Sequence, residues 1–320
     1  MTRPPKARHF NLLGTSRNMH RDNILDFGAG IAFRIFVAGA VVCSALATSR
    51  AFAQVAPEKV DQQQANTTDE LNNGADFVRP MTLFQSSIEA RTAPGGGSAS
   101  QTTSVVTTGT ENLRGIARID VAPLWALSFR ADLPFEMKMP IYSGQIEGQT
   151  LQGLSDADVQ VAVAHEFDRR WSAGVGARLY APTGEGPLST GKWQIMPGGA
   201  VRYDLTEVSP GSYLEPLAQY AVSFDGNPSA KRIRTLEFQP SLNIGLPDRW
   251  FFTFYPSADI QMNYGDKVKD QTGKLFLPFD AWIGRKVTEN LIITLEVGVP
   301  IIKDYPVYNY KVQTYVNLVF

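Results

Sequence analysis

The chain has 320 residues, with 30 Lys or Arg against 31 Asp or Glu, one cysteine and a hydrophobic content of 43%. After the first fifty-odd residues no stretch stays apolar for about 18 residues, which excludes a helical membrane protein. Membrane-spanning strands are not excluded, because their alternating side chains average out in hydropathy.

The N-terminus has the pattern of an export signal. Basic residues (Arg17, Arg21, Arg34) precede the apolar run I-F-V-A-G-A-V-V-C-S-A-L-A, and A-F-A follows at 51–53. Small residues three and one positions before the cut suit signal peptidase, so residues 1–53 are predicted to be a cleaved signal peptide. The apolar run is too short to cross ~30 Å of hydrocarbon as a helical anchor.

Cleavage changes the charge and removes the only thiol. Residues 1–53 hold seven Lys or Arg and two Asp or Glu, so the mature chain keeps 23 basic and 29 acidic residues, a net charge near −6. Such a chain is not expected to bind nucleic acid. The absence of cysteine from the mature chain suits an oxidising compartment.

Residues 54–80 are polar and rich in Gln, Asn and Asp, which predicts a mobile periplasmic leader. This leader is long enough to enter a barrel and act as a plug. From about residue 82 the chain becomes a series of period-two segments with no convincing amphipathic helix. We predict twelve strands, at 82–92, 112–122, 125–137, 157–168, 171–182, 192–205, 212–225, 232–246, 249–264, 274–287, 290–303 and 307–320.

The connections alternate between long and short. The long ones are 93–111, 138–156, 183–191, 226–231 and 265–273, and tight links such as D-R-R and V-T-E-N lie between them. An even number of strands with long loops at one end and short turns at the other is typical of an outer-membrane barrel. Residues 81–320 are therefore predicted to form an all-β, antiparallel transmembrane β-barrel of about 12 strands.

A soluble β-sandwich is the structural alternative. Globular strands average about five or six residues, however, and most of the predicted strands are at least about twice as long. Segment 249–264 illustrates the apolar face: Trp250, Phe252, Phe254, Pro256, Ala258, Ile260, Met262 and Tyr264 share one side. Aromatic residues at both ends of such a face match the two interfacial girdles of a membrane barrel.

The chain ends in the alternating segment Y-K-V-Q-T-Y-V-N-L-V-F. A strand at the terminus must pair with the first strand, since a closed barrel leaves no free edge. Its outward Val316, Leu318 and Phe320 resemble the C-terminal signal by which the barrel assembly machinery recognises its clients. Outer-membrane lipids and this machinery are the expected partners.

Several motifs resemble those of one known family. They are N-N-G-A-D-F-V-R-P at 72–80, L-R-G-I-A-R-I-D at 113–120, G-L-S-D-A-D-V-Q-V at 153–161, Y-A-P-T-G at 180–184 and T-G-K-W-Q-I-M-P-G-G-A-V-R-Y at 190–203. Together they resemble the outer-membrane transporter-like barrels labelled "meta-pathway of phenol degradation". The resemblance covers about 75 to 320. It implies an outer-membrane barrel that passes hydrophobic or aromatic compounds, and it implies no catalytic residue.

An outer-membrane lipid hydrolase is the enzymatic alternative. The mature chain has one histidine, His165, and Phe167 stands where the serine of the barrel phospholipases would follow it. His165 also shares the face of outward valines, so we expect no catalysis. No zinc-type ligand set, metal site or cofactor is predicted. A loop calcium site using Asp266 and Asp270 stays open.

Alternation sends many charged residues to the inside of the barrel. The predicted lumen-lining residues are Arg114, Arg118, Arg130, Asp132, Arg178, Arg202, Glu215, Glu237, Asp259, Asp280 and Glu296. The arginines come from the earlier strands and the later strands are almost purely acidic, which is a transverse charge pattern typical of selective pores. Twelve strands also lie between a filled interior and an open aqueous channel, so a narrow passage is expected.

We therefore predict an outer-membrane channel for passive diffusion of small-molecule solutes, with hydrophobic or aromatic compounds as the expected class. The alternative is a non-conducting binding or structural barrel that acts through its extracellular loops, chiefly 93–111 and 138–156.

Overall fold

The computed structural model describes residues 74, 76–94, 105–142, 145–146 and 150–320. All of them belong to one compact unit, 66–320. The predicted signal peptide and most of the leader lie outside the described residues. Among the residues that are described, no helix is long and apolar enough to cross a membrane.

The described chain consists almost entirely of antiparallel strands. They are β1 (Leu83–Pro94), β2 (Val105–Ala122), β3 (Trp125–Tyr142), β4 (Gln145–Ile146), β5 (Leu151–Leu154), β6 (Asp158–Glu166), β7 (Trp171–Tyr180), β8 (Lys192–Asp204), β9 (Tyr213–Gly226), β10 (Arg234–Gly245), β11 (Trp250–Phe254), β12 (Ile260–Asn263), β13 (Leu275–Thr288), β14 (Leu291–Lys303) and β15 (Tyr310–Val319). Two short 3-10 turns, Gly186–Leu188 and Pro247–Arg249, lie in connections.

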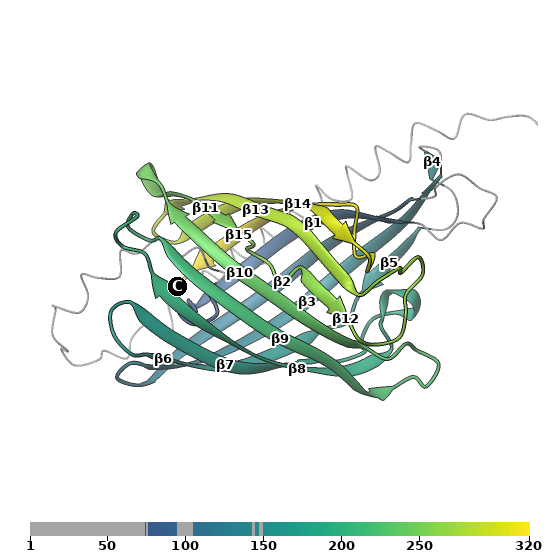
Figure 1. The fold of residues 1–320 in the computed structure, drawn as a ribbon, viewed down its shortest axis with the longest axis horizontal. Helices are drawn as coiled ribbons and strands as arrows, with labels where there is room; N and C mark the ends of the chain where they lie inside the picture. The colour runs from purple at the N-terminus through teal and green to yellow at the C-terminus, as the bar shows by residue number, and fades with distance from the viewer. Residues whose placement is uncertain (1–73, 75, 95–104, 143–144, 147–149) are drawn as a thin grey trace, which may run out of the picture. The chain divides into compact units, whose positions relative to one another are not determined.

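The sheet closes on itself. β1 pairs with both β2 and β15, so the first and last strands lie side by side. β11 and β12 together occupy one position between β10 and β13, and β4 and β5 pair only with β3. This leaves twelve positions around the barrel, whose tilted strands are visible in Figure 1. The predicted closed barrel of about twelve strands is confirmed.

The barrel is apolar outside and polar inside. Exposed hydrophobic side chains alternate with buried polar ones along most of the strands, as in β14, where Val297 and Val299 are exposed and Glu296 is fully buried. A soluble β-sandwich places its apolar face on the inside. The reversed arrangement is stable where hydrocarbon surrounds the barrel.

Aromatic side chains form a band at each end of this apolar surface. Exposed aromatics at the short-turn end are Trp125, Phe167, Trp171 and Trp250, and those at the opposite end are Trp193, Phe224, Tyr264 and Tyr310. Amphipathic rings favour the boundary between hydrocarbon and headgroups. The two bands therefore mark the two faces of the membrane.

The β6–β7 turn shows how the short-turn end is built. The Asp168 carboxylate accepts hydrogen bonds from the backbone N–H groups of Arg170 (2.7 Å) and Trp171 (2.8 Å). These bonds stabilise the ionised form and hold the pKa of Asp168 below its usual range. The backbone of this turn thus provides both hydrogen-bond donors for the Asp168 carboxylate, and the turn can stay short.

Two predicted loops are partly strand. The sequence predicts a loop over 93–111, but β2 begins at Val105 and pairs with β3 as far as Ile141. Segment 138–156 contains the end of β3 and also β5, which pairs with Phe135–Lys138. The Thr, Val and Ile residues in these segments have high β propensity, and the hairpin continues because each strand offers the other unpaired backbone groups.

The prediction of one continuous strand over 249–264 is wrong. The chain breaks between β11 and β12, where Tyr255 adopts a left-handed conformation (φ 51°) and Pro256 cannot donate to the ladder. The break changes which side chains face inward. Pro256 and Ala258, expected on the lipid side, instead line a cavity in the interior.

Phe320 lies at the seam between β15 and β1. Its backbone N–H donates to the Thr82 carbonyl (3.1 Å), while its side chain is 54% exposed. Deleting Phe320 therefore removes one terminal hydrogen bond, worth about 1 kcal/mol. If this residue is an assembly signal, we expect the deletion to lower the outer-membrane level of the protein severalfold, with little change in thermal stability.

Immunoblots of outer-membrane fractions and the heat-dependent gel shift of the purified barrel measure these two quantities. Phe320→Tyr, which keeps an aromatic terminus, is the matched control. Normal outer-membrane levels of the deletion would contradict the assembly role.

Candidate functional site: a charged cavity closed by residues 76–80

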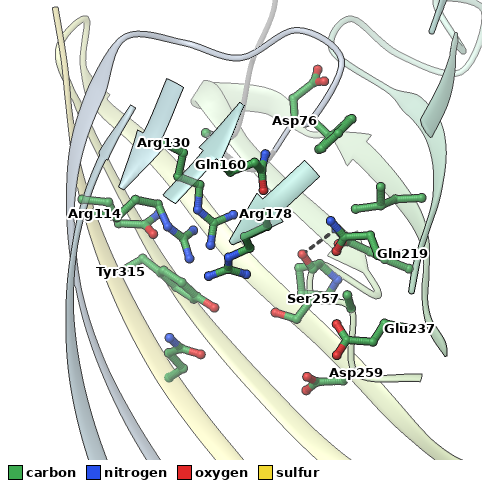
Figure 2. Close-up of a pocket in the computed structure, with 18 of the residues that line it drawn as sticks. Asp76, Arg114, Arg130, Gln160, Arg178, Gln219, Glu237, Ser257, Asp259 and Tyr315 are labelled. Carbon is green, nitrogen blue, oxygen red and sulfur yellow. Dashed lines mark hydrogen bonds between the residues drawn. The ribbon is translucent and has the colours of Figure 1, made fainter. Parts of the chain in front are cut away.

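A cavity of about 370 Å³ lies inside the barrel. Its lining comes from ten of the fifteen strands and includes six glutamines: Gln85, Gln160, Gln219, Gln239, Gln261 and Gln313. Amide side chains offer both donors and acceptors, so such a lining suits hydrated or polar contents. Figure 2 shows charged residues of opposite sign on opposite sides of this space.

Three arginines form one wall of the cavity. The wall consists of Arg114 from β2, Arg130 from β3 and Arg178 from β7. All three guanidinium groups bind Asp132: Arg114 Nε lies 2.5 Å from its Oδ1, and Arg130 Nε and Arg178 Nη2 lie 2.6 and 2.9 Å from its Oδ2.

Arg178 also pairs with Asp158, its Nη2 lying 2.7 Å from Oδ2. Three cations therefore share two carboxylates, and this wall carries a net positive charge. The terminal nitrogens of Arg114 and Arg130 make no other bond within the described part of the chain, so they are free to bind a solute.

The opposite wall is acidic. Glu237 of β10 and Asp259, in the break between β11 and β12, face the cavity from that side (Figure 2). Within the described ranges, the Glu237 carboxylate makes no hydrogen bond or ion pair. Glu89 also lines the cavity but binds Arg91, with 2.8 Å between its Oε2 and Arg91 Nη2.

Asp259 belongs to a buried cluster around Lys311 of β15. The ammonium group lies 2.5 Å from Asp259 Oδ2 and 3.0 Å from Asp280 Oδ2, and it also binds Glu296. Lys311 is 2% exposed, and Asp280 and Glu296 are fully buried. One cation thus serves three carboxylates.

The three carboxylates of this cluster are close enough to hold a metal ion, since ligand oxygens from each lie within 4.8 Å of one another. Lys311 already binds all three, however. The ammonium group therefore occupies the place that a cation would take, and the residues do not fit a metal.

Residues 76–80 lie inside the barrel, near its short-turn end. Asp76 binds Arg202 of β8, and Arg79 Nη1 lies 2.6 Å from Asp204 Oδ2. The Phe77 N–H donates to Glu215 Oε1 of β9 (2.9 Å). We call the segment 76–80 with these contacts the latch.

Apolar contacts support the latch. Val78 is 2% exposed and packs with Ala164, Ala200 and Leu217, and Phe77 adds to the same cluster. Asp76 also accepts the Val78 N–H (2.9 Å) and the Arg79 N–H (2.6 Å), which turns the chain within the barrel. Asp76, Phe77 and Pro80 line the cavity, so the latch closes one side of it.

The sequence-predicted interior residues fall into five places. Arg114, Arg130, Arg178, Glu237 and Asp259 line the cavity. Asp132 lies behind the arginine wall, and Asp280 and Glu296 bind Lys311. Arg202 and Glu215 hold the latch. Arg118 lies towards the short turns, where its Nε is 2.8 Å from Asp120 Oδ1.

Sequence reasoning missed Lys311 as a site residue. Alternation places Lys311 on the inward face of the last strand, and this was the available signal. Its three acidic partners come from β13, β14 and the break between β11 and β12, and they meet Lys311 through the register between these neighbouring strands, which the alternation of side chains does not give. The role of Asp76 was missed for a related reason, because no periodicity marks a polar segment as buried.

Two other sequence candidates have ordinary contacts. The ring of His165 stacks on the exposed Trp125, with 4.3 Å between centroids, so it lies on the lipid-facing side. Asp266, a candidate calcium ligand, instead binds Arg232 through the backbone N–H (2.8 Å) and the guanidinium group (3.0 Å to Nη2).

No family model matches the chain, and no curated protein matches it in sequence. The resemblance to the phenol-degradation barrels therefore stays a prediction.

Solved structures do match. One is the crystal structure of the COG4313 outer membrane channel from Pseudomonas putida F1, with a TM-score of 0.57, 15% identity and coverage of 76% of this chain and 97% of that chain. The KdgM porin (TM-score 0.39, 13% identity, 74% and 99% coverage) and the NanC porin (0.43, 10%, 73% and 98%) match less closely. This chain therefore has the fold of a bacterial outer-membrane β-barrel.

Proposed function

We propose that this protein is an outer-membrane channel through which small solutes diffuse passively, and that the latch, residues 76–80, restricts the passage. The observation that supports the proposal is the charged cavity at the centre of a barrel whose outer surface is apolar. A barrel that served only as a membrane anchor would gain nothing from arginine nitrogens and a carboxylate that have no partner among the described residues. Buried charges are costly unless they are paired or hydrated.

The lining of the cavity favours polar solutes for the central route. Charged and amide side chains stabilise hydrated or ionic solutes and give an apolar solute little to bind. For the central route, the lining therefore argues against the sequence-based prediction that hydrophobic or aromatic compounds pass.

One surface feature supports the prediction that hydrophobic or aromatic solutes pass. A hollow of about 550 Å³ on the barrel wall is lined mainly by apolar side chains, among them Leu83, Phe129, Val161 and Phe320. Ile116, Arg130 and Gln160 border both this hollow and the central cavity. A hydrophobic compound dissolved in the membrane could occupy the hollow.

Swelling of proteoliposomes tests the proposed function. We expect vesicles that contain the barrel without residues 54–79 to swell in small polar solutes severalfold faster than protein-free vesicles. The chain with the latch should give slower swelling. If the truncated barrel runs as folded protein on a semi-native gel but gives no swelling in polar or aromatic solutes, the channel function is wrong and the non-conducting alternative gains support.

A further inference from the structure

The two walls of the cavity offer opposite charges to the same space. We infer that the cavity binds a small zwitterion, with the carboxylate of the solute at the arginine wall and its ammonium group at Glu237 and Asp259. The biological meaning of this site rests on the proposed channel function. The binding itself can be tested without measuring passage.

The arginine wall is built to hold one more anion. Its three guanidinium groups share Asp132 and Asp158, and the terminal nitrogens of Arg114 and Arg130 are not engaged by the protein within the residues described. A carboxylate that accepts hydrogen bonds from two of these groups would balance the wall. Arginine is suited to this because its planar donors match both oxygens of a carboxylate.

The acidic wall lacks a cation in a similar way. Glu237 has no partner among the described residues, and Asp259 shares Lys311 with two further carboxylates. An ammonium group beside Glu237 would balance a charge that the protein leaves unbalanced.

Size and polarity fit a small solute. A cavity of about 370 Å³ lies at the lower end of the range typical of ligand pockets, about 300–1,000 Å³. Solutes with a single charge would satisfy only one wall. A zwitterion satisfies both and is the charge class that this arrangement selects.

The test compares three solutes with the same carbon chain: γ-aminobutyrate, butyrate and butylamine. Calorimetric titration of the detergent-purified full chain measures their affinities. We expect γ-aminobutyrate to bind about tenfold more tightly than either singly charged solute, since one added charged contact in a hydrated cavity is worth about 1.4 kcal/mol.

Two variants assign the ends of the solute. Glu237→Gln leaves no described residue without a partner. It should lower the affinity for γ-aminobutyrate about tenfold and leave the affinity for butyrate unchanged. Arg130→Gln leaves Asp132 bound to Arg114 and Arg178, and should weaken γ-aminobutyrate and butyrate but not butylamine. Glu289→Gln is the control with the same loss of charge. Glu289 lies in the β13–β14 turn and forms an exposed ion pair with Arg249.

Equal affinities for γ-aminobutyrate and butyrate would overturn the inference, as would an unchanged affinity in Glu237→Gln. A semi-native gel of each variant confirms that the barrel is folded. Binding without vesicle swelling would contradict the channel and leave the zwitterion site standing. Vesicle swelling without selective binding of γ-aminobutyrate would contradict the zwitterion site and leave the channel standing.

Discussion

Replacing Asp76 and Arg79 together by Ala is expected to release the latch and raise the single-channel conductance of the full-length protein severalfold. The double variant removes the bonds to Arg202 and Asp204, both of which are buried. Hydrogen bonds to charged groups contribute about 1.5–3 kcal/mol each. Losing two of them costs about 3–6 kcal/mol, which shifts the docked population on the order of a hundredfold or more.

Planar-bilayer recordings measure this effect. The matched control is Arg170→Gln, which breaks the exposed Arg170–Glu207 pair (3.3 Å) at the same end of the barrel and should leave conductance unchanged. The truncation of residues 54–79 sets the upper limit. Conductance of the double variant equal to that of the wild type, with the truncated barrel conducting, would show that these ion pairs do not hold the latch.

Replacing Lys311 by Met is expected to destabilise the barrel by about 3–5 kcal/mol, which is more than a typical single substitution costs. The ammonium group is the shared partner of Asp259, Asp280 and Glu296. Removing it leaves carboxylates buried without a cation, and the desolvation cost of each is then no longer offset.

Denaturant unfolding in lipid vesicles measures the loss. Adding Asp280→Asn to Lys311→Met should restore part of the stability, because one of the orphaned charges is removed. Lys274→Met, at an exposed lysine 4.9 Å from the Tyr264 ring, should change stability by about 1 kcal/mol or less. A small effect of Lys311→Met would mean that protons, and not the ammonium group, balance the cluster.

The motifs that carried the family resemblance have structural roles in this chain. Asp156, from the motif at 153–161, accepts hydrogen bonds from the Gly184 N–H (3.0 Å) and the Thr190 N–H (2.8 Å). These two residues belong to the motifs at 180–184 and 190–203. Asp76 of the motif at 72–80 binds Arg202, which also belongs to the motif at 190–203. The motifs are thus linked in space, as partners in the β7–β8 loop and in the latch.

The sequence by itself determined the class, the number of strand positions and the face of most residues. Period-two alternation suffices for this, because a strand side chain points either to lipid or to the interior. It failed at Pro256 and Ala258, where a left-handed residue and a proline break the period. It also failed in the long β2–β3 hairpin, where pairing between strands overrides weak loop signals.

Only the tertiary structure decided which inward charges meet. Arg114 and Arg178 converge on Asp132, and Lys311 meets three acids from segments up to 52 residues away. The alternation of side chains shows that a residue points inward. It carries no information about the position of that residue along the barrel axis or about the side chain that it meets on a neighbouring strand. Those depend on the register between neighbouring strands, which is a property of the sheet and not of any single strand.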